Sequence, residues 1–178
     1  MAQARVARAG AHGLPPVLPR DARILVLGSF PGVASLAAGR YYAHPRNHFW
    51  PVMGAILGEP RPAMSYDDRL ARLAARGIAL WDTIVACERK GSSDQAIRNA
   101  MHAEVSRVQR ACPGVVAVAF NGNTAARAAP RWREAGYATV ALPSSSPAYT
   151  RPLAEKIEAW NDAFFGSFSR IPTCARSS

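Results

Sequence analysis

The sequence predicts an α/β protein, built as a three-layer α/β/α sandwich around a central, mostly parallel sheet of four strands. Short apolar runs typical of buried strands alternate along the chain with segments whose apolar residues recur at helical spacing. The run over 115–120 is almost continuously apolar, which is typical of a parallel strand covered on both faces. Right-handed crossovers between such strands place all their carboxyl ends at one edge of the sheet.

The first strand is expected over 24–27, where an apolar run stops abruptly at Gly28. Residues 33–46 contain scattered glycine, tyrosine and proline residues and are expected to form an irregular loop. A helix is expected over 49–57, because its apolar residues recur at helical spacing and Gly58 ends the pattern.

A second helix is expected over 66–76, with Ser65 as its N-cap and Gly77 at its end. A proline-rich connection over 59–64 precedes it, and a second strand over 78–81 follows and leads into Asp82. Residues 88–94 are polar and read as a loop. The remaining strands are expected over 115–120 and 138–142, and the remaining helices over 94–102, 104–111, 121–129 and 152–165.

The chain is expected to form one domain over residues 21–168, between an N-terminal tail at 1–20 and a C-terminal tail at 169–178. Its 178 residues are enough for one full-sized core. Apolar residues make up 49% of the chain, which is ordinary for a globular protein.

The chain is strongly basic. It carries 22 Lys and Arg against 12 Asp and Glu, for a formal net charge of +10. This balance favours a polyanionic partner, and nucleic acid is the commonest one. A charge kept for solubility, or an arginine bias from a GC-rich genome, explains the same composition.

The cysteines do not indicate a metal centre. Cys87, Cys112 and Cys174 lie far apart and show no Cys or His ligand spacing, so iron–sulfur and structural zinc sites are not expected. An odd number of cysteines without a signal peptide fits a reducing cytosol, so a cytoplasmic protein of bacterial type is expected. No apolar run approaches the length that crosses a membrane.

Four loops are expected to converge at the carboxyl edge of the sheet, at 28–32, 82–94, 121–124 and 143–149, and three of them have a structural as well as a functional interpretation. The loop from Gly28 to Gly32 lets backbone N–H groups approach a ligand, or is simply a tight turn. The serines at 144–146 stand between two prolines and could hold a phosphate, or cap a helix. Asn121 could read a base edge, or take a left-handed turn position before Gly122.

Asn47 is a candidate on a further loop, before the helix expected over 49–57. Its carboxamide could orient a water molecule or bond a base edge, but it could equally cap the helix expected from Phe49. Nearby aromatic residues could stack on a nucleobase or belong to the core of the loop; these are Phe30, Tyr41 and Tyr42.

Taken together, these segments resemble the uracil-DNA glycosylase superfamily, and within it the hypoxanthine-DNA (deoxyinosine) glycosylases. The resemblance spans roughly residues 14–165 and is carried by five ordered pieces. They are Leu27-Gly28-Ser29-Phe30-Pro31-Gly32, Tyr41-Tyr42 with Asn47-His48-Phe49-Trp50, the stretch from Asp82 to Asp94, Phe120-Asn121-Gly122, and Leu142-Pro143-Ser144-Ser145-Ser146-Pro147-Ala148.

The resemblance implies roles for the first two pieces. Most branches carry Asp or Asn in the first motif to position the attacking water, whereas this chain has Phe30, whose ring would stack on the extruded base. In the deoxyinosine branch an Asn before Phe-Trp takes over that task, which implies Asn47 as the catalytic residue. The base would also be bound by Ser29, Tyr42 and Asn121.

The last motif implies a loop that pinches DNA and enters the minor groove. Many uracil-specific relatives begin it with a catalytic His, and Ser144 stands at about that place, which argues against uracil as the sole substrate. The implied DNA contacts are Gly28, Pro31, Gly32, Lys90, Ser144, Ser145, Ser146 and Pro147.

The resemblance thus implies a monofunctional DNA glycosylase that hydrolyses the N-glycosidic bond of a deaminated base, hypoxanthine or uracil, in double-stranded or single-stranded DNA. It would act as a monomer, near the nucleoid, without metal or cofactor. A non-catalytic lesion-binding module of the same fold is the first alternative. A small-molecule hydrolase is the second, although the chain lacks a phosphate-binding lysine loop and a GxSxG elbow.

Overall fold

The computed structural model describes residues 10–58 and 64–167. Its central sheet has four parallel strands in the spatial order β3-β2-β6-β7. This confirms the predicted α/β sandwich, and every one of these strands lies close to its predicted position. Their bounds are Ile24–Gly28 (β2), Ile78–Asp82 (β3), Ala117–Asn121 (β6) and Ala138–Leu142 (β7).

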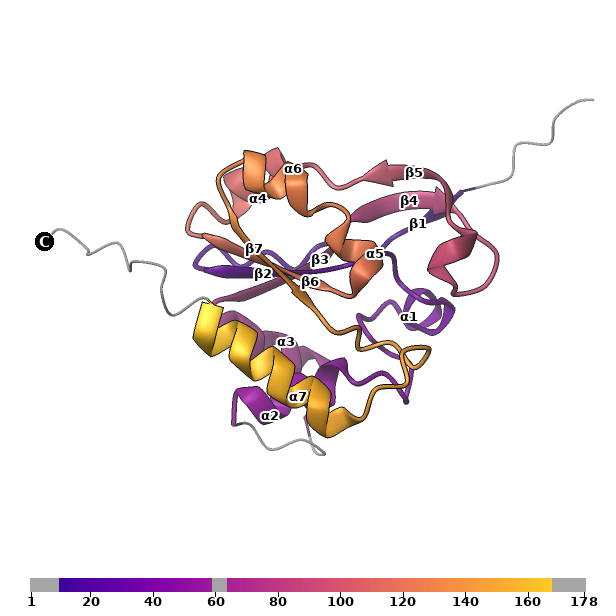
Figure 1. Cartoon of the computed structure of the whole chain (residues 1–178). Helices are drawn as coiled ribbons and strands as arrows, with labels where there is room; N and C mark the ends of the chain where they lie inside the picture. The colour runs from indigo at the N-terminus through magenta and orange to yellow at the C-terminus, as the bar shows by residue number, and fades with distance from the viewer. Residues whose placement is uncertain (1–9, 59–63, 168–178) are drawn as a thin grey trace, which may run out of the picture.

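Helices cover both faces of this sheet (Figure 1). One face packs on α2 (Phe49–Ile56), α3 (Tyr66–Ala75) and α7 (Leu153–Asn161). The other face packs on α4 (Val105–Ala111), α5 (Asn123–Ala126) and α6 (Ala129–Glu134). The alternation along β2 shows the two cores directly, since Val26 lies in the first and Leu25 and Leu27 lie in the second.

A second, antiparallel sheet lies beyond the ends of the parallel strands, and the sequence did not predict it. Its strands run in the order β1 (Ala11–His12), β4 (Ile84–Glu88) and β5 (Arg98–His102). The helix expected over 94–102 is therefore wrong, because only Asp94–Ala96 forms a 3₁₀ turn before β5. Four of the five β5 residues are exposed, so its strand conformation comes from pairing with β4 and leaves no apolar pattern to detect.

Three further boundaries differ from the expectation. The loop over 33–46 contains a short helix, α1 (Val33–Ala38), which ends at Gly39 with a φ of 62°. The single helix expected over 121–129 is divided into α5 and α6, with a proline in the first turn of α6. The closing helix ends at Asn161 and continues as a π-helical segment, Asp162–Ser167.

The N-cap of α3 is as predicted, since Ser65 Oγ accepts a 3.1 Å hydrogen bond from Asp68 N–H.

Part of the segment expected to be an N-terminal tail is packed against both sheets. Ala11 pairs with Cys87 in β4, Val17 forms a bridge with Leu80 in β3, and the Tyr41 hydroxyl donates a 3.0 Å hydrogen bond to the Pro15 carbonyl. Packed structure therefore begins before the expected boundary at residue 21. The expected C-terminal tail at 169–178, and most of the connection expected over 59–64, lie outside the described residues. Among the described helices, none has both the length and the apolarity needed to cross a bilayer.

Candidate active site

The carboxyl ends of the parallel strands open into one cavity of about 750 Å³. The predicted convergence of loops at this edge is therefore observed. Twelve of the thirteen predicted site residues line the cavity, and only Lys90, on an exposed turn after β4, does not. The twelve are Gly28, Ser29, Phe30, Pro31, Gly32, Tyr42, Asn47, Asn121, Ser144, Ser145, Ser146 and Pro147.

The floor of the cavity is a short polar row across three adjacent strands. Gly28 ends β2 and pairs with Asp82, which ends β3, while Asn121 ends β6 on the other side. Side chains alternate between faces along a strand, so these positions share the face of Val26 and Leu80. On this face of the sheet, the apolar core side chains are therefore followed by polar ones where the strands reach the cavity.

Asn121 and Ser145 are joined by two buried hydrogen bonds. Asn121 Nδ2 donates to Ser145 Oγ, and Ser145 N–H donates to Asn121 Oδ1, both over 2.8 Å. Ser145 is only 1% exposed. Its hydroxyl therefore braces the serine loop from inside, and the structure does not present it to a phosphate as expected from the sequence. The carbonyl of Ser145 also accepts a 2.9 Å hydrogen bond from His48 N–H, which ties this loop to the start of α2.

Asn47 lines the same cavity as Phe30 and the serine loop. Its Oδ1 accepts a 2.9 Å hydrogen bond from Phe49 N–H, so the carboxamide also fixes the first turn of α2. Asn47 therefore stabilises the start of α2 and also lines the cavity. A carboxamide oxygen has two acceptor sites and the nitrogen two donor sites, so capacity is left for a water molecule. His44, whose carbonyl accepts a 2.8 Å hydrogen bond from Asn47 N–H, shapes this turn.

Phe30 is 6% exposed and packs with Ile84 and Cys87. The guanidinium of Arg89 lies 4.8 Å from the centre of its ring and donates a hydrogen bond to the Pro31 carbonyl. Arg89 therefore holds both the ring and the following backbone, a contact between distant segments that could not be predicted from the sequence.

Tyr42 adopts a left-handed backbone conformation, with a φ of 55°. Its ring stacks on Phe49, with the ring centres 3.9 Å apart and the planes at 18°. One face of Tyr42 is thus occupied by the core, while its hydroxyl is buried and makes no hydrogen bond. Burial, and then the charge of Asp82, raises the pKa of this phenol.

Two carboxylates that are not among the predicted site residues, Asp82 and Asp94, also line the cavity. The Ser29 hydroxyl donates its one proton to the Asp94 carboxylate, whose two oxygens lie 2.9 and 2.8 Å from it, so Asp94 fixes the first loop. Asp82 is 3% exposed, and its Oδ2 has no hydrogen-bond partner. Burial raises the pKa of Asp82 to about 7, with a further rise from the charge of Asp94 and an opposing effect of Arg89.

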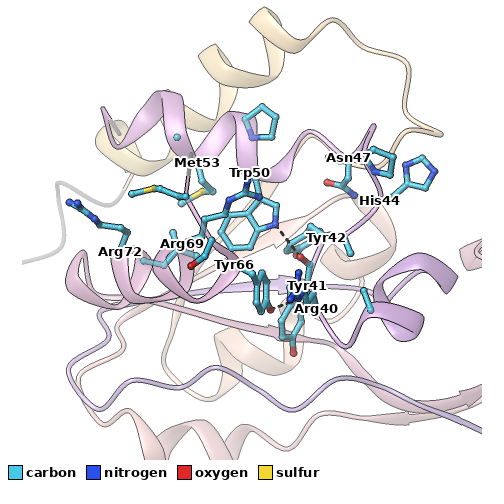
Figure 2. Close-up of a pocket in the computed structure, with 18 of the residues that line it drawn as sticks. Arg40, Tyr41, Tyr42, His44, Asn47, Trp50, Met53, Tyr66, Arg69 and Arg72 are labelled. Carbon is cyan, nitrogen blue, oxygen red and sulfur yellow. Dashed lines mark hydrogen bonds between the residues drawn. The ribbon is translucent and has the colours of Figure 1, made fainter. Parts of the chain in front are cut away.

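A second cavity of about 630 Å³ lies on the other side of the loop that carries Asn47, against α2 and α3 (Figure 2). Tyr42, His44 and Asn47 line both cavities. Trp50 Nε1 donates a 3.1 Å hydrogen bond to the Tyr41 carbonyl, and Figure 2 shows this contact beneath the Asn47 loop. The loop is thus held in place by aromatic side chains, through the bond from Trp50 and the stacking of Tyr42 on Phe49. Across residues 10–58 and 64–167, no group of three or more His, Cys, Asp or Glu side chains could hold a metal ion.

A parallel sheet with a polar cavity at the carboxyl ends of its strands defines an α/β protein that binds its ligand at that edge. Comparison with known proteins assigns the chain more closely. The family model of the uracil DNA glycosylase superfamily matches residues 15–164. The chain therefore belongs to the uracil-DNA glycosylase superfamily, and the resemblance seen in its motifs is confirmed.

Individual relatives share most of their length with this chain. It is 38% identical to the hypoxanthine DNA glycosylase of Methanosarcina barkeri over 153 residues, which are 86% of this chain and 97% of that protein. Its identity to the hypoxanthine DNA glycosylase of Methanosarcina acetivorans is 36% over the same lengths. The solution NMR structure of a candidate uracil DNA glycosylase from Methanosarcina acetivorans has a TM-score of 0.79 and 35% identity, covering 87% of this chain and 96% of that one.

Proposed function

We propose that the protein is a monofunctional DNA glycosylase that hydrolyses the N-glycosidic bond of deaminated bases, hypoxanthine or uracil, after flipping them out of DNA. The observation that carries the proposal is one cavity of about 750 Å³ in which Asn47 lies together with Phe30 and the serine loop. The two curated relatives named hypoxanthine DNA glycosylase support the same reaction. The volume suits a flipped nucleotide, because ligand pockets of this kind hold roughly 300–1,000 Å³.

Asn47 positions the water. Its bond from Phe49 N–H fixes the carboxamide, and its free acceptor site aims a water molecule at C1′ of the flipped nucleotide. An amide does not take up a proton at neutral pH, but a carbon with oxocarbenium character needs only a positioned nucleophile. Phe30 stacks on the extruded base, and Ser29, Tyr42 and Asn121 surround it.

The departing base keeps the electron pair of the broken bond, so it needs hydrogen-bond donors around it. Backbone N–H groups near Ser29 and Asn121 supply part of this, on loops that Asp94 and Ser145 hold in place. No covalent intermediate is needed. Lys90, an exposed lysine on a turn outside the cavity, contacts DNA at most.

The DNA lies over the mouth of the cavity, where the net charge of +10 favours binding to the phosphate backbone. Ser144, Ser146 and Pro147 contact the strand beside the lesion, and Gly28, Pro31 and Gly32 present backbone to it. Ser145 acts indirectly, through its bond to Asn121. The protein acts as a monomer in the cytoplasm on double-stranded DNA, and accepts single strands when the lesion is already unpaired.

The test uses oligonucleotides that each contain one hypoxanthine, uracil, xanthine or etheno-adenine. They are incubated with the protein and treated with alkali, which breaks the strand where a base has been lost. Strand breaks at hypoxanthine or uracil are expected with the wild-type protein. Tight binding without any strand break would favour the alternative function, a non-catalytic lesion-binding module. The observation that supports this alternative is Phe30, which stands where most branches carry the water-positioning residue.

A further inference from the structure

Asp82 is a buried acid that the proposed hydrolysis does not yet use. It is 3% exposed and lines the cavity, and its Oδ2 makes no hydrogen bond within the protein. An unpaired buried polar atom is costly, so it persists where a ligand supplies the partner. The Tyr42 hydroxyl, also buried and unpaired, lies in the same cavity.

Gly28 makes room for both groups. A methyl group at this position would collide with the Asp82 carboxylate and would lie 3.2 Å from the Tyr42 hydroxyl. Both polar groups therefore crowd the space that a side chain at position 28 would fill, at the end of the strand that pairs with β3. The absence of a side chain at position 28 therefore lets the carboxyl group and the phenol hydroxyl lie against the backbone where they line the cavity.

The charged and titratable groups around Asp82 come from several elements. Asp94 on the 3₁₀ turn disfavours ionisation of Asp82, and Arg89 after β4 favours it. Tyr41 and Tyr42 face it from the loop before α2, and burial followed by the charge of Asp82 raises the pKa of both phenols, so they stay protonated. His44 and Tyr149 line the same cavity. Burial and the nearby Asp94 outweigh the single guanidinium, so Asp82 carries its proton up to about pH 7.

We propose that Asp82, as a neutral carboxylic acid, is the general acid that protonates a ring nitrogen of a flipped purine as the glycosidic bond breaks. This rests on the proposed glycosylase function and adds to it the acid that acts on the deaminated purines among its substrates. The purine leaves as a neutral molecule instead of an anion, which lowers the barrier to its departure.

The proton balance closes without any other reagent. The Asp82 proton moves to N7 or N3 of the purine, and the electron pair of the C1′–N9 bond goes to the base. The water held by Asn47 adds its oxygen to C1′ and releases one proton to solvent. Asp82 then takes up a proton from solvent, so the net reaction consumes only one water molecule.

This chemistry distinguishes purines from uracil. Hypoxanthine and xanthine have a ring-nitrogen lone pair that can accept the proton. The two ring nitrogens of uracil carry the sugar and a hydrogen atom, so only its carbonyl oxygens can accept a hydrogen bond. Loss of Asp82 should therefore slow excision of hypoxanthine much more than any excision of uracil.

The first test measures single-turnover release of hypoxanthine against pH for the wild type, Asp82→Asn and the control Asp21→Asn. Asp21 is exposed and lies before β2, at the opposite end of the sheet. The wild-type rate should fall about tenfold per pH unit above pH 7, and Asp82→Asn should be about 100-fold slower at pH 6 without that fall. Asp21→Asn should follow the wild type. An Asp82→Asn protein with the wild-type rate or the wild-type pH profile would overturn the inference.

The second test needs no variant, so it holds even if Asp82→Asn folds poorly. The wild type is given 7-deazahypoxanthine or 3-deazahypoxanthine in DNA, each of which replaces one ring nitrogen by C–H. One of the two should be released at least about tenfold more slowly than hypoxanthine, and the difference should shrink in Asp82→Asn. Equal release of all three bases by the wild type would overturn the inference.

The outcomes distinguish a failure of the Asp82 inference from a failure of the proposed glycosylase function. Release of hypoxanthine that is insensitive to Asp82 and to both deaza substitutions would remove the general acid and leave the glycosylase intact. A wild-type protein that releases no base from any of the lesions tested would overturn both.

Discussion

Asn121 and Ser145 hold each other through two 2.8 Å hydrogen bonds, one in each direction, at the end of β6. Both residues are buried, at 9% and 1% exposure. The pair therefore fixes the serine loop relative to the sheet, and through the Ser145 carbonyl it also fixes the start of α2 that follows Asn47.

Replacing Asn121 with Ala should lower the free energy of unfolding by about 1–3 kcal/mol, because it leaves the Ser145 N–H and hydroxyl buried without partners. Urea unfolding measures the change. Asn161→Ala, at an exposed position at the end of α7, is the control and should change little. Equal stability of Asn121→Ala and the wild type would show that the pair does not brace the loop.

Serines 145 and 146 should separate stability from DNA binding. Ser145→Ala removes a buried hydroxyl and should lower the stability by about 1 kcal/mol. Ser146→Ala removes a partly exposed hydroxyl whose hydrogen bond from Ala148 N–H is also exposed, so it should weaken DNA binding by about 1 kcal/mol with little change in melting temperature. Thermal melts and titrations of a lesion-containing duplex check both. Weaker DNA binding by Ser145→Ala, together with a lower melting temperature of Ser146→Ala, would show that Ser145 contacts the phosphate.

Asp82→Asn should stabilise the protein at pH 8 by on the order of a few kcal/mol. The folded-state pKa is raised from 3.8 to about 7, so the unfolded chain loses this proton at lower pH than the folded protein does. The contribution of Asp82 to stability therefore declines as the pH rises from 3.8 to about 7, and stays low above it. Urea unfolding of both proteins across this range measures it. A stability difference that does not grow with pH would mean that Asp82 ionises normally.

Gly28→Ala should destabilise the protein by about 1–3 kcal/mol, because its methyl group collides with the Asp82 carboxylate. Asp82→Ala in the same chain removes the colliding oxygen, so the double variant should recover about 1 kcal/mol or more relative to the sum of the two single changes. A double-mutant cycle of unfolding free energies tests this. Additive effects would show that the two positions do not share the space.

The parallel sheet could be predicted from the sequence because its strands are apolar runs that end at Gly28, Asp82, Asn121 and Leu142. The edge of the sheet that holds the ligand follows from that topology alone. The antiparallel sheet could not be predicted in the same way. β5 is mostly exposed and polar, and the two residues of β1 are too short a pattern to detect.

The residues that line the cavity could be predicted where they belong to a motif, but not where a contact between distant segments brings them there. Asp82 stands one position beyond the apolar run at 78–81, and only its register with Gly28 places it in the cavity. Arg89 reaches Phe30 across the fold, and Asp94 reaches Ser29 across 65 positions. A signal for Asp82 was available: a lone acid that ends a buried parallel strand points to the ligand edge.

The most direct test of the account concerns Asn47. It compares Asn47→Ala, which loses both the water position and the bond from Phe49 N–H, with Asn47→Ser, whose hydroxyl can still accept that bond. Asn47→Ala should lose about 1 kcal/mol of stability, which Asn47→Ser should largely restore.

Both variants should still bind hypoxanthine-containing DNA, because neither change removes a contact to the phosphate backbone. Their single-turnover release of hypoxanthine should fall by at least about 100-fold, since water is no longer held against C1′. Wild-type release by Asn47→Ser would contradict the account and leave Asn47 as a helix-start residue alone.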